Sequence, residues 1–155
     1  MDLESVSVTP IDPRSPSARE CLAAYAAELA ERFPEGYRES DLADPAELSH
    51  PHGAFLVATH MAAPIGCGGL RTVDAGIGEI RHMWVHAEFR RIGLGRLLIA
   101  ELERAAGDLG LTALRLGTHR SLPEALALYR SLGYAEIEPY EGTAHTDHWF
   151  AKRLR

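Results

Sequence analysis

The sequence has a single lysine, Lys152, and only two cysteines, Cys21 and Cys67. Without an internal lysine there is no Gly-Lys-Ser/Thr motif, so a nucleotide P-loop is excluded. One cysteine pair is a poor disulfide framework, and we expect buried free thiols in a reducing compartment. We expect no signal peptide, because the first residues carry neither a basic nor an apolar segment. No apolar run approaches the ~20 residues that span a bilayer. These absences predict a cytoplasmic protein without a membrane partner.

The overall composition is that of an ordinary globular protein. Its 155 residues are 46% hydrophobic and 25% charged, and the formal net charge is −6. This length predicts a single domain, residues 1–155, with one core. Because nucleic-acid binding needs a basic face, the acidic balance argues against nucleic acid as a partner. It favours a cationic substrate such as an amine through long-range attraction.

A glycine-rich run follows an apolar segment and opens an amphipathic one. Two glycines spaced one residue apart let backbone amides approach a ligand, and a helix start adds free N–H groups and partial positive charge. Leu98 stands where a dinucleotide-binding fingerprint needs a third glycine or alanine. The run therefore predicts a pyrophosphate site of another type, made of Arg90, Arg91, Ile92, Gly93, Leu94, Gly95 and Arg96.

Hydrophobic periodicity and turn formers predict an alternating series of strands and helices. A capping box at 121–124 is expected to open the last helix. The region 37–52 is expected to be a loop with at most a short helix. The expected elements are a strand at 4–11, a helix at 17–33, strands at 54–59, 65–73 and 78–86, a helix at 94–109, a strand at 113–117, a helix ending at 132, and strands at 134–140 and 148–154.

Three segments, in order, resemble the GNAT superfamily of N-acetyltransferases, small single-domain bacterial enzymes among them. Residues 79–85 (Glu-Ile-Arg-His-Met-Trp-Val) resemble its fourth strand, residues 90–96 its pyrophosphate loop, and residues 124–134 its Ala-x-x-Leu-Tyr-x-x-x-Gly-Phe/Tyr segment. The resemblance covers nearly the whole chain. It implies an α/β (α+β) GNAT fold: a mixed, mostly antiparallel sheet of six to seven strands flanked by about four helices.

The resemblance also implies acetyl-CoA as co-substrate, bound by the strand residues Met83, Trp84 and Val85 and by the whole run 90–96. Many family members have an asparagine seven residues before the motif tyrosine. Leu122 stands there in this chain, so Thr118 or His119 is expected to replace it.

Two residues are candidates for proton transfer. Glu79 occupies the position of the family's glutamate base, and the alternative is a solvated charge at the start of a strand. Tyr129 matches the family's general acid, which protonates the departing thiolate; the alternative is a core tyrosine. No cysteine lies in the motif segments, so direct attack in a ternary complex is expected rather than an acyl-enzyme.

The function implied is acetyl-CoA-dependent N-acetyl transfer to a primary amine of a small molecule or peptide. The alternatives are a non-catalytic acyl-CoA-binding or sensing module, and a transferase for another acyl group or an oxygen nucleophile. The acceptor pocket is expected at 33–40, around Arg71, and in the loop 140–145. The eight histidines do not complete a tetrahedral set, so no metal site is expected. Family members commonly dimerise, but nothing in this sequence requires a homodimer.

Overall fold

The computed structural model describes residues 3–141 and 145–155, and these residues form one sheet of seven strands. The strand order is β1-β2-β3-β4-β5-β7-β6, and every neighbouring pair is antiparallel except β4 and β5. The strands are β1 (Val6–Pro10), β2 (Gly53–His60), β3 (Ala63–Asp74), β4 (Ile77–Val85), β5 (Ala113–Thr118), β6 (Ala135–Ile137) and β7 (His148–Arg153).

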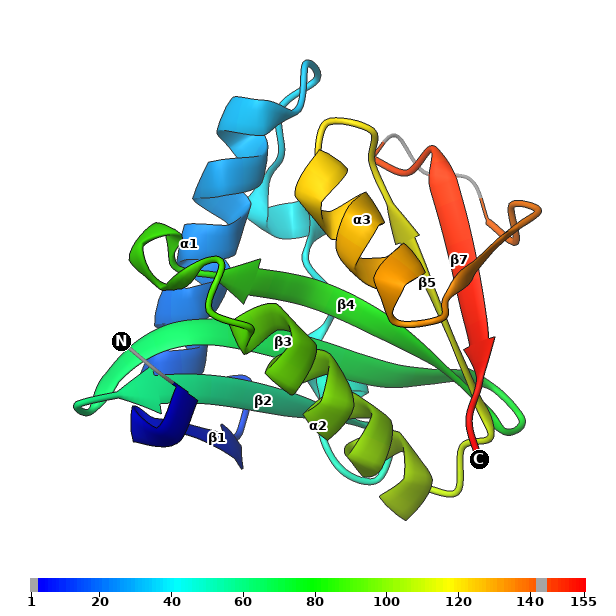
Figure 1. Cartoon of the computed structure of the whole chain (residues 1–155), viewed down its shortest axis with the longest axis horizontal. Helices are drawn as coiled ribbons and strands as arrows, with labels where there is room; N and C mark the ends of the chain where they lie inside the picture. The colour runs from blue at the N-terminus through cyan, green and yellow to red at the C-terminus, as the bar shows by residue number, and fades with distance from the viewer. Residues whose placement is uncertain (1–2, 142–144) are drawn as a thin grey trace.

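Helices cover both faces of this sheet (Figure 1). The described residues include the α-helices α1 (Pro16–Arg32), α2 (Leu94–Asp108) and α3 (Pro123–Ser131), and the 3-10 helices η1 (Leu3–Ser5), η2 (Glu39–Asp41), η3 (Pro45–Leu48) and η4 (Ala87–Phe89). The predicted order of strands and helices and the predicted fold class are confirmed. The segment 37–52, expected to hold at most a short helix, contains the two 3-10 turns η2 and η3.

The core has one apolar layer on each face. The stripe Leu94, Leu98 and Leu102 of α2 is fully buried against the sheet, as its helical spacing predicts. Tyr129 of α3 belongs to the same side of the core as Leu102. On the opposite face, Cys21 of α1 packs in the apolar cluster that also contains Cys67 and Trp84. Both cysteines are buried free thiols, as predicted.

The sheet splits between β4 and β5, and this split positions the site. The two strands pair only where residues 77–79 meet residues 113–115. Beyond that point they diverge (Figure 1), while β5 remains paired with β7 along its length. One edge of β4 therefore lacks a neighbouring strand along residues 80–85, so its backbone groups are available to a ligand.

A β-bulge interrupts β4 at the same level. Arg81 lies opposite Gly69 and Trp84 opposite Cys67, so two residues, His82 and Met83, face the single intervening residue of β3. His82 adopts a left-handed backbone conformation, with φ of 58°. The bulge changes which side chains share a face of the strand.

Two local predictions were wrong. The expected capping box does not form: Leu122 is the N-cap of α3, without a side-chain hydrogen bond. The carboxylate of Glu124 instead pairs with Arg32 of α1, a partner that local sequence cannot reveal. The expected strand 134–140 is reduced to β6, because the amide of Tyr134 still bonds to α3 through the carbonyl of Tyr129 and Pro139 has no amide hydrogen to offer a ladder.

Part of the loop 140–145, expected to contribute to the acceptor pocket, lies outside the described residues: positions 142–144 are among those not described. Within the described part of the chain, no helix is long and apolar enough to cross a membrane.

Candidate active site

A cavity of about 760 Å³ opens where β4 and β5 separate, bounded by α1, α2 and α3. It contains the predicted residues of the strand, of the glycine run and of the last helix together. Those that line it are Met83, Trp84, Val85, Arg90, Arg91, Gly93, Leu94, Gly95, Arg96, Thr118 and Tyr129. Ile92, the remaining residue of the run, instead packs in an apolar cluster with Val85 and Leu97.

The glycine run forms the N-terminal end of α2. Gly93 is the N-cap, in a left-handed conformation with φ of 92°, and has no side chain to cap the helix. The first helical hydrogen bond runs from Leu97 to the carbonyl of Gly93, which leaves the preceding amides of the first turn without helical acceptors. A Cβ on Gly95 would lie 2.9 Å from a methyl group of Leu128 on α3. The loop is thus a tight cradle of backbone donors facing the cavity.

Two of the arginines around this cradle also hold neighbouring elements. Nε of Arg90 donates to the carbonyl of Val85 at 2.9 Å, and its guanidinium pairs with Glu28 of α1. Arg96 donates to the hydroxyl of Ser131 on α3 at 2.9 Å. Arg91 lines the cavity with a left-handed backbone, φ 67°. The guanidinium groups bring α1, α3 and the cradle together, and direct phosphate contact remains a prediction.

The free edge of β4 presents backbone groups of Val85 to the split. The amide of the next residue, His86, donates to Ile65 on the β3 side at 2.8 Å. Because successive residues of a strand point their backbone groups to opposite edges, those of Val85 point away from β3. The carbonyl of Val85 accepts the hydrogen bond from Arg90, which leaves the amide of Val85 as a donor toward the cavity.

Tyr129 belongs both to the core and to the cavity wall. Its side chain is 6% exposed, and its ring lies 6.0 Å from that of Tyr134 and 6.4 Å from that of Phe150. It also lines the cavity. Burial raises the pKa of Tyr129 well above the usual value for tyrosine, so its hydroxyl stays protonated.

The comparison with known proteins identifies the family. Residues 20–134 match the model of the acetyltransferase (GNAT) family. The chain belongs to the GNAT acetyltransferase family. It is 35% identical over 100 residues to the IAA acetyltransferase of Azospirillum brasilense, a match covering 64% of this chain and 65% of that protein. The match thus spans slightly less than two thirds of that relative.

Solved acetyltransferase structures share the architecture over almost the whole chain. An acetyltransferase from Streptococcus agalactiae superposes with a TM-score of 0.82 at 15% identity, covering 97% of this chain and 99% of that one. An aminoglycoside 6'-N-acetyltransferase in complex with coenzyme A gives 0.70 at 19% identity, with coverages of 95% and 96%. At these identities the similarity establishes the fold.

Glu79, the candidate base of this GNAT protein, does not line the cavity. It is 2% exposed, and its Oε1 lies 2.8 Å from Nη2 of Arg71 and 3.4 Å from Nη1 of Arg81. Its Oε2 accepts the hydroxyl hydrogen bond of Tyr140 at 2.8 Å. Both oxygens are therefore engaged, and the expected alternative of a solvated charge does not hold. The role of Glu79 as base remains a prediction.

Of the two proposed replacements for the missing asparagine, only Thr118 lines the cavity. It is 8% exposed, at the end of β5. Nδ1 of His119 accepts the amide hydrogen of Ser121 at 3.0 Å, and its ring lies 4.6 Å from that of Phe33. His119 therefore organises the turn into α3, which favours Thr118 at the site.

Tyr25, Arg81 and His82 are among the cavity residues that sequence analysis did not assign to the site. In the sequence, Arg81 and His82 are part of the motif at 79–85 and carry no further signal of a role at the site. Their shared location depends on the β4 bulge, which leaves no signal in the local sequence. In the part of the chain that the structure describes, no group of three or more potential metal ligands occurs.

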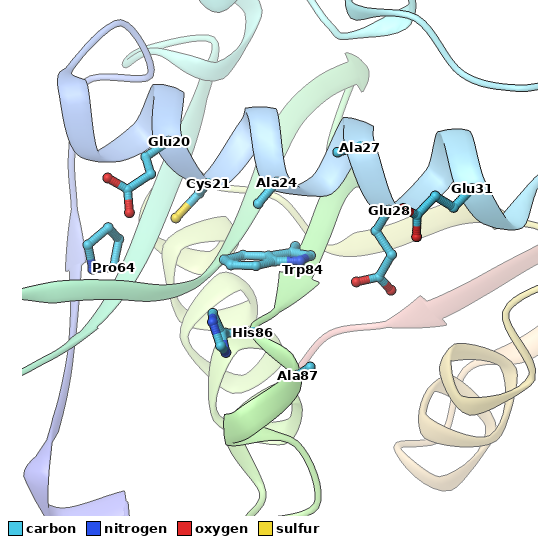
Figure 2. Close-up of a pocket in the computed structure, with 10 residues that line it drawn as sticks. All are labelled: Glu20, Cys21, Ala24, Ala27, Glu28, Glu31, Pro64, Trp84, His86 and Ala87. Carbon is cyan, nitrogen blue, oxygen red and sulfur yellow. The ribbon is translucent and has the colours of Figure 1, made fainter.

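A second, smaller pocket of about 420 Å³ lies beneath α1 (Figure 2). The indole of Trp84 and the ring of His86 face Cys21 and Ala24, and glutamates of α1 stand at its margin. It shares Trp84 and Glu28 with the larger cavity. Glu28 is paired with both Arg32 and Arg90 at this boundary.

Proposed function

We propose that this GNAT protein transfers an acetyl group from acetyl-CoA to the nitrogen of a primary amine by direct attack in a ternary complex. The observation that carries the proposal is one continuous cavity that runs from the α2 cradle at Gly93, along the free edge of β4, to Tyr129. Anion donors, a strand edge and a proton donor are thereby arranged along one path.

The residues present fit the chemical parts of acetyl-CoA. The first-turn amides of α2, together with Arg91, suit a pyrophosphate, because a helix N-terminus concentrates N–H donors and partial positive charge. The amide of Val85 suits an amide of the pantetheine arm or the thioester oxygen. A cavity of about 760 Å³ lies within the usual ~300–1,000 Å³ of small-molecule sites.

The thioester supplies an activated acetyl carbon, to which the amine nitrogen bonds as the carbon–sulfur bond breaks. Tyr129 then donates a proton to the departing thiolate, since burial raises the pKa of its hydroxyl and keeps it protonated. The amine nitrogen loses one proton to solvent as the amide forms, and the Tyr129 oxygen takes one up from solvent, which restores the starting state. At pH 7 only about 0.1% or less of a lysine-like amine is in the neutral, nucleophilic form. Burial in the cavity disfavours the charged ammonium form of a bound amine and so favours the nucleophilic state.

The proposal is tested by following thiol release from acetyl-, propionyl- and succinyl-CoA with a panel of amines and alcohols. Acetyl-CoA and a primary amine should give the highest kcat/KM. Preference for a longer acyl group or for an alcohol would support the other transferases. Tight acyl-CoA binding without turnover of any acceptor would support a binding or sensing module and overturn the proposal.

A further inference from the structure

The β4 bulge places two consecutive side chains on the α1 side of the sheet. Ile80 and Met83 pack in the core on the α2 side. Between them, His82 faces α1, because its ring lies 5.0 Å from that of Tyr25. Arg81 shares a strand face with Glu79, whose carboxylate it contacts. In a regular strand these two neighbours would point to opposite faces, but here both line the same cavity.

His82 brings a fixed hydrogen-bond donor to this position. Its Nε2 accepts the amide hydrogen of Ala43 at 3.0 Å, so the proton of the neutral ring must be on Nδ1. Nδ1 is buried and has no acceptor among residues 3–141 and 145–155. Burial, with Arg81 and Arg71 nearby, lowers the pKa of His82 to about 3, so the ring is neutral at physiological pH. A buried N–H without an acceptor is costly, which favours a ligand that supplies one.

Arg81 brings positive charge that the surrounding structure balances only weakly. Its one ion pair within the described residues is the 3.4 Å contact with Glu79, and Arg71 holds that same oxygen at 2.8 Å. The two carboxylates in the cavity wall, Glu28 and Glu124, are both bound by Arg32. The Arg81 side chain is 25% exposed. Its free N–H groups are thus available to an anion in the cavity.

We propose that Arg81 and His82 together bind a carboxylate of the acceptor, so that the substrate class is amino acids or amines of amino-acid type. A guanidinium edge and a neutral N–H donor match the two oxygens of one carboxylate. A doubly charged phosphate would need more cationic groups than Arg81 supplies at this position. This inference rests on the proposed transfer to an amine in the same cavity. It names a second group of the acceptor, its carboxylate, that the protein binds.

The test compares matched acceptors that differ only in the carboxylate. Phenylalanine, tyrosine and lysine are each paired with their carboxamides, and initial rates of thiol release from acetyl-CoA are measured. The carboxamides have the lower ammonium pKa values, so intrinsic reactivity favours them. We nevertheless expect at least a tenfold higher kcat/KM for the acid in the pair that is best used. Equal rates or a preference for the carboxamide would overturn the inference and leave acetyl transfer intact.

Variants locate this preference in the structure. Arg81→Gln should raise the KM for the acid at least tenfold, change kcat by no more than a few fold, and leave the carboxamide unaffected. Arg81→Lys keeps the charge but loses the planar guanidinium, so its KM for the acid should lie between those of the wild type and of Arg81→Gln. Arg104→Gln is the matched control, since the Arg104 side chain is 74% exposed on α2. An Arg81→Gln enzyme that keeps its preference for the acid would contradict the proposal.

If no member of the panel is acetylated, binding of the same pairs to the CoA-saturated protein decides the question. Calorimetry should show tighter binding of the acid, lost in Arg81→Gln. Equal or absent binding of the acids would overturn the inference. Failure of the protein to bind acetyl-CoA would instead overturn the proposed function, so the two failures are distinguishable.

Discussion

Replacing His82 with glutamine should make folding less sensitive to acid. The His82 ring is held neutral with a pKa of about 3, against 6.5 for an ordinary histidine. Between these two pH values His82 is protonated in the unfolded chain but not in the folded chain. Its contribution to the free energy of unfolding is therefore fully present above about pH 7 and is lost as the pH falls. Glutamine does not titrate, and its carbonyl oxygen can still accept the amide of Ala43.

The size of the effect follows from the two pKa values. At pH 5 the pH lies 1.5 units below the pKa of 6.5 of the unfolded histidine. Protonation of the unfolded chain then lowers the free energy of unfolding by about 2 kcal/mol relative to pH 7. The folded value of about 3 lies far below pH 5, so the loss at this pH depends almost entirely on the unfolded chain. At pH 3 the loss should reach about 4 kcal/mol.

Urea unfolding of both proteins at pH 7 and pH 5 measures this difference. The remaining titratable groups are common to both, so their contributions largely cancel when the pH-dependent change of the variant is subtracted from that of the wild type. The wild type should lose about 2 kcal/mol more than His82→Gln between these pH values. Equal pH dependence in the two proteins would refute the reasoning, because it would mean that folded His82 is protonated as readily as a free histidine.

Three further predictions concern residues assigned to the site from sequence. Gly93→Val should weaken acetyl-CoA binding at least tenfold by calorimetry, about 1.4 kcal/mol; Gly110→Val, at a similar positive φ but with open space around it, carries the same backbone strain and should leave affinity unchanged. Tyr129→Phe should lower turnover about 10- to 100-fold with little change in stability, whereas an unstable variant with intact turnover would make Tyr129 a core residue only. Glu79→Gln should lower turnover about 10²-fold, and less at high pH, if Glu79 acts as base; reduced thermal stability at wild-type turnover would assign it to the Arg71 and Arg81 network alone.

Much of the architecture follows from local sequence. The apolar stripe of α2 repeats at helical spacing, and the strand segments alternate or run apolar between turn formers, so periodicity alone places these elements. The run at 90–96 is equally local, because a left-handed N-cap at Gly93 and the free amides after it depend on neighbouring residues only. The predicted phosphate cradle, Tyr129 and the strand residues 83–85 accordingly lie around one cavity.

Tertiary structure decided which charges remain available. Glu124, expected to cap its own helix, is bound to Arg32, and Arg90 is bound to Glu28; these partners are 92 and 62 positions apart in sequence. Glu79 lies in a buried ion network because β3 places Arg71 beside it. Pairings of this kind depend on strand register and helix packing, which local pattern does not encode.

The placement of Arg81 and His82 shows most clearly how tertiary structure decides what local sequence does not. Sequence alternation assigns them to opposite faces of β4, and only the bulge against β3 turns both toward α1. The sequence by itself thus determined most of the elements and the glycine cradle at the start of α2, because these arise from contacts between near neighbours. The charge of Arg81 and the unpaired donor of His82 were placed in the cavity wall by the tertiary structure, because this wall is formed where residues distant in the chain are packed together.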